Sequence, residues 1–147
     1  MNPFLMQPRE LLSQWKMVRT QLKDHPEIEQ LQMVLDFWNK APLKNMAYDP
    51  EVLDEYPTPW DMMTENDWCP NSIAVGMDFT LRLGGWNADR LKIQMIRDYD
   101  LSVQKLVVVV DGKYLLNYEY SVVSELPKTN HDILDTWVFT GKHYERI

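Results

Sequence analysis

The sequence predicts an α+β fold in which helices come first and an antiparallel sheet follows. Apolar residues recur at helical spacing over residues 8–40, whereas from residue 91 they alternate with polar ones or form a continuous run. Asp111-Gly112, between two apolar segments, is the strongest short signal for a strand hairpin. We therefore expect a helical hairpin in residues 1–42 and, in residues 43–147, an α+β domain with a helix packed on a small antiparallel sheet.

Two helices are expected at residues 8–23 and 26–40. The apolar stripe of the first consists of Leu11, Trp15, Val18 and Leu22. The stripe of the second consists of Ile28, Leu31, Leu35 and Trp38. Ala41-Pro42 ends the second helix, because the residue before a proline avoids the helical region. The short turn between the two predicts an antiparallel pair whose stripes face each other or the domain.

A short helix is expected after Pro59, and a longer one from Cys69 to about Leu83, where Gly84-Gly85 stops it. Strands are expected at residues 91–99, 103–110 and 113–120, with one more edge strand in residues 136–147. The run LVVVV at 106–110 is too apolar for an exposed edge. It predicts a central strand that the Cys69 helix covers on one face.

Composition excludes several classes of function. The net charge of −7 and pI of about 4.9, with basic residues scattered among acidic ones, argue against nucleic-acid binding. A single cysteine permits no intrachain disulfide or CxxC metal site, and no apolar run is long enough for a membrane span. We find no secretion signal, nucleotide-binding glycine motif or calcium loop. The expectation is an intracellular or assembly-bound protein without cofactor or metal.

The segment ENDWCPNSIAVGM, residues 65–77, holds that single cysteine. Pro70 suits the first position of a helix, which places Cys69 at the N-cap. There a thiol faces unpaired backbone N–H groups and the positive end of the helix dipole, which favour the reactive thiolate. The simpler interpretation is a buried, inert thiol, because free cysteine is among the most buried residue types.

Two stretches together resemble a known family. PTPWDMMTENDWCPNSIAVGMDFTLRL followed by KLVVVVDGKYLLNY is similar to the transglutaminase-like cysteine-protein superfamily, and most similar to its small members from tailed bacteriophages. The resemblance covers about residues 57–120 and implies a catalytic cysteine at a helix start, a histidine on the next strand and an aspartate on the strand after. Cys69 matches the nucleophile, and Asn117 falls at the aspartate position.

The chain departs from that pattern at the histidine. Gln104-Lys105-Leu106 occupies the strand start where the family has its imidazole. We expect Lys105 to keep its ammonium in water there, so that it cannot replace a neutral base. The three histidines are His25, His131 and His143. A fold can bring either of the last two to Cys69, since catalytic groups are recognised by geometry rather than by chain order.

The sequence is therefore compatible with two functions. The first is a non-catalytic structural or assembly protein of a tailed phage particle, in its tail, neck or baseplate region. It would be a pseudoenzyme, present in the virion or in the host cytoplasm during assembly, whose partners are other particle proteins in one or several copies. The second is an active thiol enzyme of the amidase, peptidase or transglutaminase-like kind, with Cys69 as nucleophile. The two functions are distinguished by whether an imidazole nitrogen lies within hydrogen-bond reach of Cys69 Sγ. The absence of a histidine from the expected strand favours the first.

Two further expectations concern packing. Trp60, Trp68 and Trp86 are expected in the core around the Cys69 helix. Asp98 and Asp100 flank a strand end and are expected as turn residues.

Overall fold

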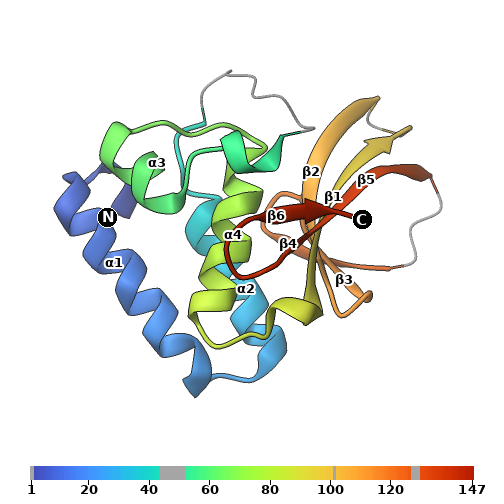
Figure 1. The fold of residues 1–147 in the computed structure, drawn as a ribbon. Coiled ribbons are helices and arrows are strands. Elements are labelled where there is room, and N and C mark those ends of the chain that lie inside the picture. Colours follow the sequence, from blue (N-terminus) through green and yellow to red (C-terminus); the bar gives the residue numbers. More distant parts are fainter. Residues whose placement is uncertain (1, 44–51, 101, 127–129) are drawn as a thin grey trace.

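The computed structural model describes residues 2–43, 52–100, 102–126 and 130–147, and its fold is α+β as predicted. The helices lie on one side of the molecule and the sheet on the other (Figure 1). The helices are α1 (Pro8–Gln21), α2 (Glu27–Trp38), α3 (Pro59–Glu65) and α4 (Ser72–Leu83), with 3₁₀ turns η1 (Pro3–Leu5), η2 (Leu22–Asp24), η3 (Leu53–Glu55) and η4 (Ala88–Arg90). The strands are β1 (Leu91–Asp98), β2 (Val103–Val110), β3 (Tyr114–Glu119), β4 (Val122–Glu125), β5 (His131–Phe139) and β6 (Tyr144–Arg146).

The N-terminal helices form close to where the periodicity places them. α1 and α2 run in opposite directions and diverge from their connecting turn (Figure 1). α1 rests on α3 and α2 on α4, so each stripe faces the rest of the molecule more than the other helix. Ile28 is wrong as a stripe member, because it is 47% exposed at the first turn of α2, where the helix has not yet reached the core.

Helix α4 carries the centre of the core. Thr80 Oγ1 accepts the indole N–H of both Trp15 and Trp38, at 2.8 and 2.9 Å, and donates its own proton to the Gly76 carbonyl at 2.6 Å. Gly76 is required here because an added Cβ would lie 2.5 Å from the Trp38 ring. One hydroxyl thus joins α1, α2 and α4. A single apolar core contains residues from both sides of the boundary that was expected between residues 42 and 43.

The sheet has the order β4-β3-β2-β1-β5-β6, with antiparallel neighbours. β2 is a central strand, as its apolar run predicts, and its residues Leu106, Val108 and Val110 belong to the core under the helices. On the opposite face Val107 and Val109 join a second apolar cluster. Alternate side chains of a strand point to opposite faces, so the run is buried on both.

The C-terminal part of the sheet differs from the prediction. β5 begins at His131 and lies between β1 and β6. The C-terminal segment therefore holds two strands, and of these two β6 lies at an edge of the sheet. The exposed first half of β5 mixes polar and apolar residues without a clear period, and a bulge opposite Met95 and Ile96 interrupts it. β4 was not predicted, because four residues carry little signal.

The expectations for the tryptophans and for the two aspartates can be compared with the structure. Trp68 and Trp86 are buried, but Trp60 is 42% exposed and packs one edge against Trp15. Asp98 is wrong as a turn residue: it is fully buried in β1, where the Tyr118 hydroxyl donates to its carboxylate. Asp100 is exposed as expected and accepts a hydrogen bond from the Asn130 side chain.

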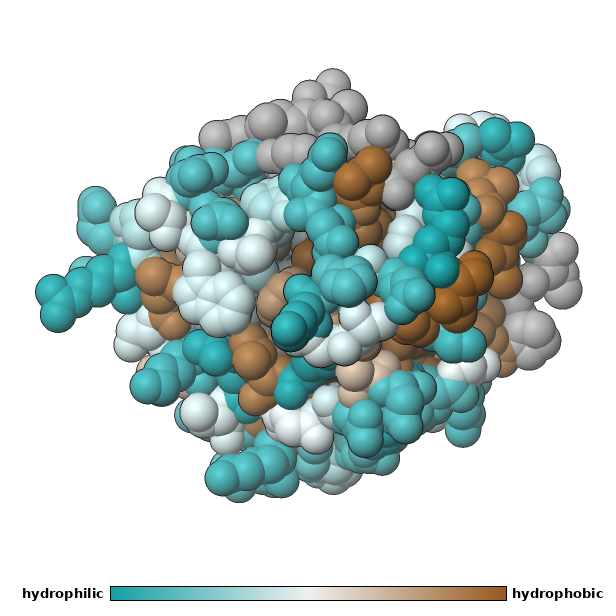
Figure 2. All heavy atoms as spheres, in the orientation of Figure 1, coloured by the Kyte–Doolittle hydropathy of each residue, from teal (hydrophilic) through white to brown (hydrophobic). Residues whose placement is uncertain are grey.

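The surface shown in Figure 2 is mostly hydrophilic, and its apolar residues gather toward the sheet side. Exposed apolar side chains of the sheet include Val103 on β2 and Ile133 and Leu134 on β5. Within the described residues, no helix combines the length and the apolar character that crossing a membrane demands.

Candidate functional site

Cys69 lies just before the turn that leads into α4, three residues ahead of Ser72, the first residue of that helix. Its carbonyl accepts the backbone N–H of Ile73 at 3.3 Å, and its Sγ accepts that of Ser72 at 3.2 Å. Ser72 returns the contact, because its hydroxyl oxygen accepts the Cys69 N–H at 3.0 Å. This reciprocal pair has the form of a capping box, with cysteine in place of the usual serine or threonine and serine in place of glutamate. The helix that was predicted from Cys69 begins three residues later, at Ser72, and its N-cap residue is Asn71.

The thiol itself is closed off from solvent. Cys69 is 1% exposed, between Trp68 at 0% and Ile73 at 2%. Its Sγ has a structural task in the cap, since it satisfies one of the backbone donors that every helix start leaves unpaired. A substrate carbonyl cannot approach this sulfur without displacing its neighbours.

Two asparagines connect the helix start to the sheet. Leu106 is paired with Met95 of β1, but the ladder between β2 and β3 extends only to the pair Val108 and Leu116, so Leu106 has no strand partner on the β3 side. Asn71 Oδ1 accepts the Leu106 N–H at 3.1 Å, and Asn117 Nδ2 donates to the Leu106 carbonyl at 2.8 Å. Two side chains thus replace one missing rung of the sheet.

Asn117 is fixed by the same contacts. Its amide also donates to the Pro70 carbonyl at 3.0 Å, so both N–H bonds are engaged. Its backbone has φ of 68°, in the left-handed region that asparagine tolerates better than most residues. In this structure Asn117 joins β3, β2 and the helix start; no imidazole stands against its amide nitrogen.

The strand start that lacks the family histidine contains a half-buried cation. Gln104 is exposed, while Lys105 Nζ donates to the Tyr118 carbonyl at 2.7 Å. Burial lowers the pKa of Lys105, and the negative charges of Asp98 and Glu119 oppose that shift. The expectation of a fully hydrated ammonium is therefore wrong: Lys105 is half-buried, and its Nζ is bonded to the backbone of β3.

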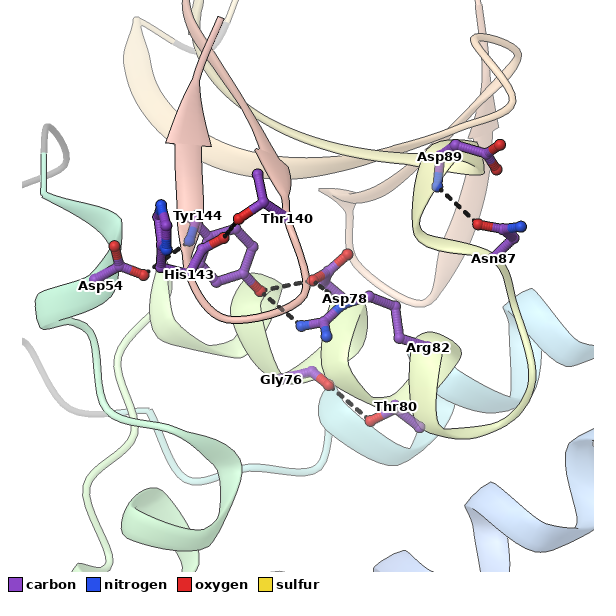
Figure 3. A network of polar contacts seen from close by, with 10 residues as sticks. All are labelled: Asp54, Gly76, Asp78, Thr80, Arg82, Asn87, Asp89, Thr140, His143 and Tyr144. Atoms are coloured by element: carbon purple, nitrogen blue, oxygen red, sulfur yellow. Dashed lines mark hydrogen bonds and ion pairs between the residues drawn. The ribbon is translucent and has the colours of Figure 1, made fainter.

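The structure places all three histidines away from hydrogen-bond contact with Cys69, whose Sγ and backbone pair with Ser72 and Ile73. His25 lies in the turn before α2, where its Nδ1 is 3.4 Å from Glu29 Oε2. His131 begins β5, with its ring 6.3 Å from that of Tyr118. His143 lies in the turn before β6, next to Asp54 (Figure 3). No imidazole completes the family constellation.

The second half of α4 holds a different polar cluster (Figure 3). The Tyr144 hydroxyl donates to Asp78 Oδ2 at 2.6 Å, and Arg82 Nε donates to the same oxygen at 2.9 Å. The Arg82 guanidinium lies 3.6 Å from the centre of the Phe139 ring. Burial raises the pKa of the Asp78 carboxyl, against the pull of Arg82, and raises that of the Tyr144 hydroxyl well above its ordinary value. The cluster attaches β6 to α4.

The described residues contain no group of three or more His, Cys, Asp or Glu side chains arranged to hold a metal ion. The sequence analysis missed the roles of Asn71 and Ser72 and the burial of Lys105. A signal existed for the first two, because Cys-Pro-Asn-Ser puts a hydroxyl three residues after the cap, as a capping box does. The burial of Lys105 had no signal, since it depends on how β3 turns away from β2.

No protein-family model matches the chain, and no curated protein matches it. Among solved structures it resembles LapG of Legionella pneumophila. The calcium-bound form has a TM-score of 0.76 and 17% identity, over 95% of this chain and 79% of that one. A second LapG structure gives 0.74 and 19%, over 95% and 77%, and the EGTA-treated form gives 0.74 and 18%, over 93% and 79%. The coverage necessarily includes most of the two N-terminal helices. At this identity the likeness shows the fold: an α+β architecture with a transglutaminase-like core.

Proposed function

We propose that this protein is a non-catalytic structural or assembly protein built on a transglutaminase-like scaffold. The observation that carries the proposal is the state of Cys69. Cys69 is 1% exposed, and its sulfur accepts the Ser72 N–H and has no hydrogen bond to an imidazole. A thiol protein that cuts or transfers an amide needs a group to take the thiol proton and return it to the leaving amine.

The residues at the family's other two positions also serve the fold. Lys105 spans the gap to Tyr118, and Asn117 completes the ladder at Leu106. Exposed Ile133 and Leu134 on β5 offer apolar surface for a neighbouring protein. The sequence likeness to tailed-phage proteins over residues 57–120 supplies the setting: a component or assembly factor of a phage particle, with other particle proteins as partners.

The second candidate is an active thiol enzyme. It is favoured by the fold shared with LapG and by the backbone N–H that points at Cys69 Sγ from a helix start. It requires an opening of the Trp68 and Ile73 contacts and a base that reaches the sulfur in that open state.

Alkylation separates the two. We expect iodoacetamide to modify the folded protein at Cys69 at least about a hundredfold more slowly than a denatured control, because reaction must await an opening of the structure. The matched control is the same protein in urea at the same pH, read by intact mass. Rapid modification of the folded protein at pH 6, together with hydrolysis that Cys69→Ala abolishes, would establish the enzyme. The setting is tested separately by mass spectrometry of purified particles, in which the chain should be present.

A further inference from the structure

Helix α1 and the turn after it form the basic part of an acidic protein. α1 lies at the end of the molecule away from the sheet, with one side facing outward (Figure 1). Residues 8–23 contain four basic side chains and one acidic one, although the whole chain has a net charge of −7. The four basic residues are Arg9, Lys16, Arg19 and Lys23. Positive charge is therefore concentrated on one element.

These four side chains form a row, which we call the cationic row. Arg9, Lys16 and Lys23 are exposed and recur at every seventh residue, the last of them in η2, the turn that follows α1. Seven residues are close to two helical turns, so the three lie along one side, about 10 Å apart. Arg19 is three residues after Lys16 and therefore its neighbour on the helix surface.

No member of the cationic row has an acidic partner among the described residues. The ion pairs of the protein involve other cations, such as Arg82 with Asp78 and Arg90 with Glu27. Exposed cations are well solvated by water, so the row alone indicates only a charged surface. The evidence for a binding surface comes from Arg19 and from the tryptophan beside it.

Arg19 differs from the rest of the row because it is partly desolvated. Its Cζ lies 4.1 Å from the centre of the Trp15 ring, and its Nε is buried without a hydrogen-bond partner among the described residues. Burial lowers the pKa of Arg19, so its charge has lost hydration that no carboxylate replaces. Of the guanidinium nitrogens only Nε is enclosed in this way, which leaves the two terminal nitrogens to pair side by side with a carboxylate.

Trp60 adjoins Arg19 through the same buried ring. Its ring centre is 5.1 Å from that of Trp15 and 5.9 Å from that of Phe79 on α4. Trp60 is 42% exposed, and its indole N–H has no acceptor among the described residues, whereas Trp15 is fully buried and donates to Thr80. Tryptophan and arginine are the residues that most often carry the binding energy of protein interfaces.

We propose that the cationic row and Trp60 form a docking surface for an acidic amphipathic helix of a partner protein. The partner helix lies alongside α1, with apolar side chains on Trp60 and carboxylates opposite the cations. Packed helices lie 8–10 Å apart and share one rise per residue, so acidic residues that recur every seven positions match the row. This inference rests on the proposed function and names the chemistry of one partner.

Charge also selects among the possible occupants. Nucleic acid carries negative charge along its whole length, and a second copy of this chain brings another −7, so the protein as a whole repels both. A helix that is acidic on one side meets the row without bringing charge to the remaining surface. Its apolar stripe also covers the exposed face of Trp60, which phosphate groups would not.

The test uses the full chain and a designed alanine-rich peptide of about 21 residues, long enough to form a helix. The peptide carries one leucine and one glutamate per heptad on one side, and its control has glutamine for each glutamate. Fluorescence anisotropy of the labelled peptides measures binding. We expect the glutamate peptide to bind at least about tenfold more tightly at low salt, and this preference to shrink in about 0.5 M salt, which screens exposed charges. Equal binding of the two peptides would overturn the proposal.

Variants locate the surface. Arg19→Gln and Trp60→Ala should each weaken binding of the glutamate peptide at least about tenfold. Lys92→Gln, which removes an exposed cation from β1, is the matched control and should bind as wild type does. Joint replacement of Lys16 and Lys23 by Gln alters exposed side chains only, so it serves if the first two variants are unstable in urea; it should weaken binding about threefold to tenfold. Unchanged binding in the double variant, or in a stable Arg19→Gln protein, contradicts the assignment.

Further probes test the other occupants. Duplex DNA and vesicles that contain phosphatidylglycerol are titrated under the same conditions, and sedimentation measures self-association. Tighter binding of DNA or of vesicles than of the glutamate peptide, or a dimer that Arg19→Gln dissociates, would overturn the proposal. Failure of docking would leave the alkylation result for Cys69 intact, because that experiment reads a different residue.

Discussion

The two halves of helix α4 treat buried polar groups in opposite ways. In the second half, Thr80 satisfies two indole N–H groups, and Asp78 pairs with both Arg82 and Tyr144. Just before its start, the sulfur of Cys69 is buried against Ser72, while Asn39 at the end of α2 keeps a donor without a partner among the described residues and Lys105 on β2 a poorly solvated charge. Polar groups that are fully paired fix one structure, whereas those left incomplete do not contribute in this way.

The largest expected effect lies in the paired half. Thr80→Val keeps the shape of the side chain but removes the acceptor of the Trp15 and Trp38 indoles. We expect a loss of about 2–4 kcal/mol in the free energy of unfolding, since each unmet buried donor costs about 1–3 kcal/mol. Urea unfolding monitored by tryptophan fluorescence measures it.

Thr80→Ser is the control for that experiment. It retains the hydroxyl and loses only a methyl group, so about 1 kcal/mol should be lost. If the valine variant were as stable as the serine variant, the hydroxyl would not be the element that joins the three helices, and the comparison between the two halves of α4 would fail.

A smaller effect should follow the loss of the Tyr144 hydroxyl. Tyr144→Phe removes the hydrogen bond to Asp78 and should cost about 1–2 kcal/mol at pH 7. Because burial raises the pKa of Tyr144, its contribution is complete below the ordinary tyrosine value of about 10 and is lost as the pH rises beyond it. The difference between wild type and variant should therefore shrink at pH 11.

Urea midpoints at pH 7, 9, 10 and 11 test this pH dependence. Tyr120→Phe is the matched control, since Tyr120 is 78% exposed and lies outside the Asp78 cluster. A gap between wild type and Tyr144→Phe that stays constant from pH 7 to 11 would show that the hydroxyl is not held in its neutral form by the fold.

The sequence predicts the parts of this fold that depend on local pattern. The spacing of apolar residues by four and three predicts α1 and α2, and Pro70 predicts the start of α4 to within three residues. Asp111-Gly112 predicts the hairpin, and both of these turn residues have positive φ. The short strand β4 and the placement of β5 between β1 and β6 depend on pairing between distant segments, which no local pattern records.

The candidate site was predictable only in its first residue. Pro70 places Cys69 near the start of a helix, because helix starts have chemical signatures, although the N-cap residue is Asn71. The roles of Asn117 and Lys105 depend on the ladder between β2 and β3 ending at Val108 and Leu116. That ending follows from the left-handed backbone of Asn117, a conformation that the sequence permits but does not require.

The smallest expected effect concerns Cys69 itself. The sulfur fills a small buried space and accepts one backbone N–H, so Cys69→Ala removes little volume and one weak acceptor. We expect a loss of about 1 kcal/mol in the free energy of unfolding and no loss of assembly or infectivity. Cys69→Ser should restore the cap, since serine is a preferred N-cap residue and its oxygen can accept the Ser72 N–H. A folded Cys69→Ala protein that cannot support assembly, with Cys69→Ser equally inactive, would show that the sulfur acts chemically and that the start of α4 is a working thiol centre.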